Sequence, residues 1–191
     1  MQRGMAELHL ITLTGADQAP YLDAVARLRA TVFAEWPYLY AAPAGASFTP
    51  TPGTALVLAL DGDRAVGAAT CQPMEEASAP VRAAGLDPAT HCYFGESVLL
   101  PEYRGRGAGV RFFAAREAQA RAMGLAHAAF CAVVRNPNDP RQPPGYQPLD
   151  NFWRRRGYTP QPGISAIMHW PEPVDGGRAT PHSLAFWTRA L

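Results

Sequence analysis

The sequence lacks the features that mark several large classes of protein. Its 191 residues include 17 basic and 16 acidic side chains, for a formal net charge of +1, so no broad electrostatic surface favours nucleic acid or an anionic membrane. No apolar run approaches the length of a membrane-spanning helix. The N-terminus has no basic segment followed by an apolar one, as a secretory signal has. We therefore expect neither a nucleic-acid nor a membrane partner.

Cysteine is also scarce. Cys71, Cys92 and Cys131 are separated by 21 and 39 residues and lie within apolar segments, and the chain has no CxxC pair. That spacing favours neither a zinc site nor a disulfide framework, so we expect no bound metal. The odd number of cysteines and the absence of a signal segment indicate a reducing, cytoplasmic setting.

The predicted elements alternate between strands and helices. The simplest organisation for 191 residues is a single domain spanning residues 1–191. Periodicity and turn signals predict strands over 8–14, 54–60, 65–74, 91–100, 125–134, 163–170 and 183–191, helices over 20–35, 108–123 and 149–157, and loops over 41–53 and 135–148. Residues 75–90 are expected to form a short helix or an irregular segment. This order predicts a mixed α/β fold with one strand–helix–strand crossover.

A glycine-rich turn follows the fourth predicted strand. The stretch YFGESVLLPEYRGRGAGVRFF (93–113) moves from an apolar strand through a proline into RGRGAG and then into a helix. Its glycines permit positive φ and let a ligand approach the backbone, while the unpaired N–H groups at the helix start attract an anion. A tight turn without a ligand is the alternative. The sequence matches neither a Walker A motif nor GxGxxG, and RGRG lacks the surroundings of an RNA-binding tract.

Two motifs together resemble those of one enzyme family. The R-x-x-G-x-G element (Arg104, Gly107, Gly109) and the later F-W-R-R-R-G-Y element (152–158) are similar in kind and order to those of the GCN5-related N-acetyltransferase (GNAT) family. The PYLY element (37–40) resembles an uncharacterised bacterial subgroup acting on small molecules. The resemblance implies a mixed, mostly antiparallel sheet of about seven strands, flanked by helices, with a splayed central strand pair. It also implies acetyl-CoA-dependent N-acetyl transfer to a small-molecule primary amine, and a possible homodimer.

The resemblance implies a role for the glycine turn and for the strand before it. Backbone N–H groups of the turn are expected to bind the pyrophosphate of acetyl-CoA; these residues are Arg104, Gly105, Arg106, Gly107, Ala108 and Gly109. Main-chain groups of Val98, Leu99 and Leu100 are expected to pair with the pantetheine arm as an added strand does. An N–H of Val98 or Leu99 is the candidate oxyanion donor. Asn136 either contacts the pantetheine or caps the following loop.

Glu96 is the candidate general base, because a carboxylate within an apolar strand is unusual without a task and relatives use a glutamate on this strand. The alternative is a structural ion pair between Glu96 and an arginine. For the acid, Trp153 stands where many relatives have a tyrosine and cannot protonate a thiolate. Tyr146 is the candidate in its place, or else a loop aromatic packed on the cofactor side.

The acceptor wall is expected to come from the first helix and its exit. Arg29, Phe33, Tyr38 and Tyr40 are the candidates. Arg29 favours an acceptor that carries a carboxylate, although most of the aromatic side chains suit the core equally well.

The three arginines 154–156 are interpreted as a solvated helix face, with a contact to the nucleotide phosphate of the cofactor as the other possibility. Two rival functions stay open: a non-catalytic acyl-CoA-binding or sensor protein, and a protein or peptide N-acetyltransferase.

Overall fold

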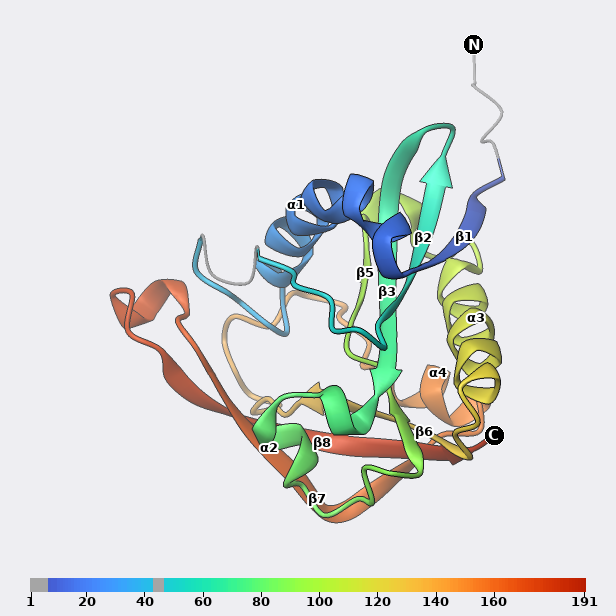
Figure 1. Ribbon diagram of the computed structural model, residues 1–191. Helices are drawn as coiled ribbons and strands as arrows, with labels where there is room; N and C mark the ends of the chain where they lie inside the picture. Colours follow the sequence, from blue (N-terminus) through green and yellow to red (C-terminus); the bar gives the residue numbers. More distant parts are fainter. Residues whose placement is uncertain (1–6, 43–46) are drawn as a thin grey trace.

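The computed structural model describes residues 7–42 and 47–191 and contains one mixed sheet flanked by helices (Figure 1). The strands are β1 (His9–Thr14), β2 (Ala55–Asp61), β3 (Arg64–Pro73), β4 (His91–Tyr93), β5 (Ser97–Leu99), β6 (His127–Val133), β7 (Thr159–Trp170) and β8 (Thr180–Ala190). The α-helices are α1 (Leu22–Phe33), α2 (Ala79–Arg82), α3 (Ala108–Ala122) and α4 (Asp150–Arg155), and 3-10 turns cover Gly15–Tyr21, Met74–Glu76, Pro101–Tyr103 and Pro173–Asp175. The sheet runs β1-β2-β3-β4-β6-β8-β7, with β5 also beside β3.

The fold class predicted from the sequence is confirmed. Every strand pair is antiparallel except β4 with β6. The sheet has eight strands instead of the predicted seven because the segment expected as one strand over 91–100 is broken at residues 94–96. The α1 helix begins only at Leu22, after a 3-10 turn, and residues 43–46 of the predicted loop lie outside the described residues.

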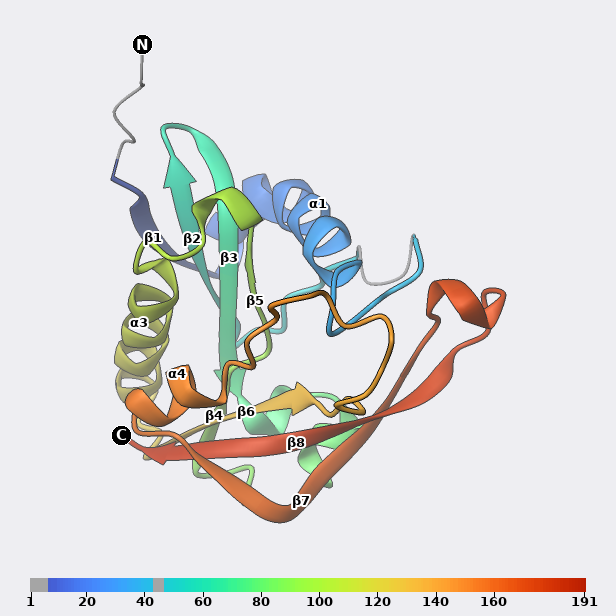
Figure 2. The same ribbon diagram turned by 180° about the vertical axis from the view of Figure 1, so that it is seen from behind.

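Helices α1 and α3 cover opposite faces of β2 and β3 (Figures 1 and 2). Side chains alternate between the two faces of a strand, so Leu56 and Leu58 pack against α1 while Val57 and Ala59 pack against α3. Because both faces are covered, β2 is apolar at nearly every position. No helix within the described ranges has the length and hydropathy needed to span a bilayer.

The central strands part beside residues 94–96. Strand β4 pairs with β6 up to Tyr93 opposite Ala129, and one further bond runs from the Phe94 N–H to the Ala129 carbonyl (2.8 Å). Beyond that point β5 pairs only with β3, and β6 pairs only with β8. Gly95 lies at the break, where an added Cβ would stand 2.9 Å from Thr70 Oγ1. The predicted splayed pair is therefore present, with its opening between β5 and β6.

A buried ion-pair network holds the exit of α1 against the sheet. Glu172, 4% exposed, follows β7 and forms ion pairs with Arg135 (2.6 Å) and Arg141. Arg135 also donates to the backbone carbonyl of Tyr38 (2.8 Å), which accepts a second bond from Trp170 Nε1 (3.0 Å). Residues 36–40, 135–141 and 170–172 are distant in sequence but meet in this network, which fixes the position of residues 36–40.

We expect Glu172→Gln to lower the free energy of unfolding by about 3 kcal/mol, because it leaves the buried Arg135 cation without its carboxylate. Urea denaturation at neutral pH measures this change. The matched control is Glu35→Gln, whose ion pair with Arg104 (2.8 Å) is exposed and is expected to contribute less than about 1 kcal/mol. Equal effects of the two substitutions would contradict a structural role for the network.

Candidate active site

A cavity of about 650 Å³ opens where β5 and β6 part. Its walls come from the exit of α1, residues 94–99, the glycine turn, one face of α3, residues 130–132 of β6, and the segment that leads into α4. The two helices that flank the opening, α3 and α4, lie on the same side of the sheet (Figure 2). Most of the residues predicted for the site from the sequence lie around this cavity.

The glycine turn forms one end of the cavity. Gly105 and Gly107 have φ angles of +75° and +79°, and a Cβ added at either position would meet no atom within 4 Å. Gly107 directly precedes the first residue of α3, so the unpaired N–H groups of the first helical turn and the positive end of the helix dipole face this space. The turn can therefore hold an anion through its backbone.

The two arginine side chains of the turn are engaged elsewhere. Arg104 donates to the Leu99 carbonyl (3.1 Å) and pairs with Glu35 (2.8 Å), while Arg106 lies over the Tyr103 ring at 5.2 Å. Arg106 does not line the cavity, whereas Arg104, Gly105, Gly107, Ala108 and Gly109 do. The structure therefore gives no support to the prediction that Arg106 contacts the donor.

Alternate residues of β5 point their main-chain groups into the opening. The Glu96 carbonyl accepts from the Thr70 N–H (3.0 Å), and the Leu100 N–H donates to Val66 (3.0 Å), both toward β3. Val98, opposite Ala68, continues the same alternation. The N–H and C=O groups of Ser97 and Leu99 therefore face away from β3. Of the three residues predicted to pair with the pantetheine, only Leu99 presents its backbone to the cavity.

Glu96 lies at the break itself. Its side chain is 9% exposed; Oε2 forms an ion pair with Arg29 of α1, and Oε1 is buried without a hydrogen-bond partner. The ion pair considered as the alternative for Glu96 is thus present. It occupies only one oxygen of the carboxylate of a residue that lines the cavity, and the other oxygen has no hydrogen-bond partner.

The predicted acceptor residues divide into two groups. Tyr38 lines the cavity beside Trp36, and burial raises the pKa of the Tyr38 phenol above its ordinary value. Phe33 and Tyr40 pack behind Tyr38, with ring centroids 4.9 and 6.2 Å from its ring, and do not line the cavity. Arg29 reaches the site through its ion pair with Glu96.

Tyr146, the candidate acid, lies in different surroundings from Trp153 and Asn136. Tyr146 lines the cavity, half-buried, with its ring 6.1 Å from Trp36 in an edge contact, and burial raises the pKa of its phenol. Trp153 packs against Phe130 and Trp187 at 5.0 and 5.1 Å. Asn136 lies outside the cavity, exposed, and its Oδ1 accepts from the Asn138 N–H (2.9 Å). This contact is the loop-capping alternative considered for Asn136.

Arg116 is a site residue that sequence reasoning missed. This α3 side chain is 2% exposed and lines the cavity, with its guanidinium 4.4 Å from the Phe94 ring and 4.7 Å from the Phe113 ring. It donates to the Phe112 and Glu96 carbonyls (3.2 and 3.4 Å). Burial lowers its pKa to about 10, so it stays cationic at neutral pH. The weak hydrophobic stripe of α3 had given no signal that Arg116 faces inward.

Cys131 is a second missed residue. It lies on β6 and lines the cavity, with its Sγ 3.1 Å from the Tyr93 hydroxyl. Burial raises the pKa of the Cys131 thiol to about 11, so at neutral pH the sulfur is protonated and a poor nucleophile. Within the described residues no group of three or more His, Cys, Asp or Glu side chains is placed to hold a metal ion.

Solved structures with the same fold are acyltransferases of several kinds. An acyl-CoA N-acyltransferase from Pseudomonas aeruginosa is 18% identical, with 96% of this chain and 100% of that one covered and a TM-score of 0.58. An acetyltransferase from Thermus thermophilus is 18% identical over 98% and 99% of the chains, with a TM-score of 0.52. The CoA-dependent acyl-homoserine lactone synthase BjaI, solved with SAM and isopentyl-CoA, is 15% identical over 94% and 83%, with a TM-score of 0.59.

At these identities the structural neighbours show the fold alone. No curated protein matches the sequence significantly. The family model described as the acetyltransferase (GNAT) family matches residues 17–143, a range that holds the early helix, the hairpin β2–β3, Glu96 and the glycine turn. Because this match covers well over half of the residues, the chain belongs to the acetyltransferase (GNAT) family.

Proposed function

We propose that the chain is an acetyl-CoA-dependent N-acetyltransferase that passes the acetyl group directly to the primary amine of a small molecule, with Glu96 as general base. Family membership makes the chain an acyltransferase with acetyl-CoA as donor. The observation that carries the finer proposal is the Glu96 carboxylate, buried at the point where the central strands part, with Oε1 unpartnered beside the cavity.

The residues around the cavity fit the donor. The N–H groups of the turn 104–109, at the start of α3, suit its pyrophosphate, because the positive φ of Gly105 and Gly107 leaves the space before them free of side chains. The main-chain groups of Ser97 and Leu99 suit the pantetheine arm, which then takes the place of a strand in the opening. When bound, acetyl-CoA supplies the thioester carbonyl and a thiol leaving group.

The proposed roles follow from the chemistry of amine acetylation. Glu96 Oε1 takes the proton of the incoming ammonium, directly or through a water, while the ion pair of Oε2 with Arg29 holds the carboxylate in place. The Leu99 N–H is directed into the opening and is the oxyanion donor favoured by the ladder geometry. The cation of Arg116 also lines the cavity and would favour negative charge that develops within it.

Tyr146 is proposed as the general acid: its hydroxyl would donate its own proton to the leaving thiolate, and the phenolate would regain a proton from solvent. Its phenol lines the cavity and is protonated at neutral pH, since burial raises its pKa. Trp153 has no acidic proton of use at this pH. The protonated thiol of Cys131 favours direct transfer over a covalent acetyl-enzyme.

Several features support a small acceptor. The wall formed by residues 36–40 is fixed by Arg135 and Trp170, which limits the widening that a protein substrate requires. The fold also serves a synthase solved with SAM and isopentyl-CoA, so it can place a small acceptor beside an acyl-CoA. Trp153 is the observation that favours the rival non-catalytic binding protein, because it cannot serve as an acid.

A single domain over 1–191, a homodimer and a cytoplasmic location stay predictions.

Gly107→Asp tests the donor cradle against the matched variant Gly107→Asn. Both side chains tolerate the left-handed region and both favour helix starts, but only aspartate places a negative charge where the pyrophosphate is expected. At about a hundred times the dissociation constant, acetyl-CoA should stabilise the wild type by roughly 2.7 kcal/mol. We expect the aspartate variant to lose most of this thermal stabilisation and the asparagine variant to keep most of it. Equal retention by both would contradict the cradle.

Glu96→Gln is expected to lower kcat about 100-fold, because the amide cannot accept the proton of the ammonium. The measurement is release of the CoA thiol with a panel of small amines, with acetyl-CoA affinity determined by calorimetry in parallel. Affinity for acetyl-CoA should change little. Asp63→Asn, in the exposed turn between β2 and β3, is the control and should leave kcat unchanged. An unaltered kcat in Glu96→Gln would contradict the role of Glu96 as general base, whereas donor binding without transfer to any amine in the wild type would favour the non-catalytic alternative.

Tyr146→Phe keeps the ring against Trp36 and removes only the hydroxyl. If the hydroxyl is the acid, kcat falls about 100-fold with little change in the KM for acetyl-CoA. Steady-state kinetics at saturating donor measure both constants. Tyr21→Phe, directly before α1 and outside the cavity lining, controls for loss of a phenol elsewhere. Wild-type kcat in Tyr146→Phe would assign Tyr146 to the wall and leave protonation to solvent.

A further inference from the structure

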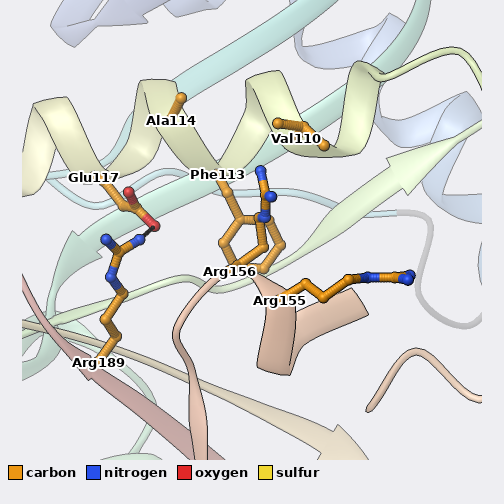
Figure 3. A pocket seen from close by; sticks show the side chains of 7 residues that line it. All are labelled: Val110, Phe113, Ala114, Glu117, Arg155, Arg156 and Arg189. Atoms are coloured by element: carbon orange, nitrogen blue, oxygen red, sulfur yellow. Dashed lines mark hydrogen bonds and ion pairs between the residues drawn. The ribbon is translucent and has the colours of Figure 1, made fainter. Parts of the chain in front are cut away.

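A second, smaller pocket lies between α3, the end of α4 and the end of β8 (Figure 3). Its volume is about 270 Å³, and its polar lining consists of Arg155, Arg156, Arg189 and Glu117. In the close view, the Arg156 side chain rises toward α3 and that of Arg155 extends along the pocket toward the start of the helix. Three cations therefore meet one carboxylate in a protein whose overall net charge is only +1.

Glu117 is already neutralised. Its Oε1 accepts from Arg189 (2.9 Å) and from the Tyr158 hydroxyl (3.1 Å), so Arg189 and Glu117 cancel. Arg155 and Arg156 remain, and neither guanidinium has a hydrogen bond or ion pair within the described part of the chain. The Nε of Arg156 is buried and has no acceptor. Two cations that line one pocket without a carboxylate partner repel each other, so an anion bound in the pocket would be favoured by both.

This pocket adjoins the donor cavity. Val110 and Phe113 line both spaces, and Val110 belongs to the first turn of α3, directly after the glycine turn. The pocket therefore lies one helical turn from the proposed pyrophosphate cradle, on the side of α3 that faces α4. A ligand that carries a second anionic group a short distance from its pyrophosphate can reach both.

We infer that Arg155 and Arg156 bind the phosphate monoester on the ribose of the acyl-CoA donor, so that the pocket distinguishes CoA thioesters from their 3′-dephospho forms. The inference rests on acyl-CoA being the donor of the proposed function. A guanidinium offers paired donors that match phosphate oxygens, and such charge-assisted bonds are among the strong ones.

Only two of the three consecutive arginines line the pocket. Arg154 lies over the Trp187 ring at 5.2 Å and does not line the pocket, whereas Arg155 and Arg156 do. The sequence-based interpretation of all three as a solvated face is therefore wrong for Arg156, whose Nε is shielded from solvent. Arg154 provides a control that removes the same charge from the same helix outside the pocket.

The test is calorimetric titration of the full chain with acetyl-CoA and with 3′-dephospho-acetyl-CoA. We expect the wild type to bind acetyl-CoA about tenfold more tightly, the size of one or two charge-assisted hydrogen bonds after solvation. Arg156→Gln should bind the two donors with nearly equal affinity, Arg155→Gln should show a smaller difference than the wild type, and Arg154→Gln should keep the full ratio. Binding of the dephospho donor should be the same in all four proteins.

Three outcomes would overturn the inference. The wild type could bind the two donors equally, Arg156→Gln could weaken both donors by the same factor, or Arg154→Gln could reduce the ratio as much as Arg156→Gln. Failure of the wild type to bind either donor is a different result, because it removes the acyl-CoA site itself and the proposed function with it. Because the readout is a ratio between two ligands, partial loss of folded protein does not imitate the expected result.

Discussion

The parting of the central strands at residues 94–96 is the constraint on which the rest of the site depends. A buried strand must satisfy its N–H and C=O groups, yet β5 pairs on one side only and leaves the main-chain groups of Ser97 and Leu99 without a strand partner on the other. The same break turns Glu96 toward α1 and opens the space between β5 and β6. Backbone pairing, the position of the carboxylate and the cavity are thus consequences of one interruption in the ladder.

Three ion pairs with a buried carboxylate lie near this opening. Glu96 with Arg29, Glu172 with Arg135, and Glu117 with Arg189 each join segments that lie far apart in the sequence. Such pairs contribute little net stability compared with apolar packing, but removing one partner is costly, so they define one arrangement of the elements. Their arrangement keeps residues 36–40, Glu96 and helix α3 in fixed relative positions, and transition-state stabilisation requires preorganised groups of this kind.

The opposite side of the cavity has an aromatic wall. Trp153 lines the cavity and packs against Phe130 and Trp187. The polar groups that line the cavity there come from other elements: Tyr146 from the loop before α4 and Arg116 from α3. A phenol and a buried cation together can manage the charge of a leaving thiolate, one by giving a proton and the other by favouring the anion.

The sequence by itself determined most of the elements, the fold class and the glycine turn, because these depend on local signals. The Asp-Gly hairpin, the alanine-rich helix α3 and the glycines that permit positive φ at Gly105 and Gly107 are each encoded within a few neighbouring residues. Glu96 stood out for a similar reason, as a charge within an apolar run. The resemblance carried by the two motifs then indicated the family.

Only the tertiary structure decided which side chains share a space. Arg116, Cys131 and the Arg135–Glu172 network gave no local signal, and Asn136, which the sequence suggested for the cofactor, caps its own loop. The ladder register also decided that Leu99, and not Val98 or Leu100, presents its amide to the opening. Register and burial depend on contacts between residues dozens of positions apart, and the hydrophobic pattern within one segment does not reveal those contacts.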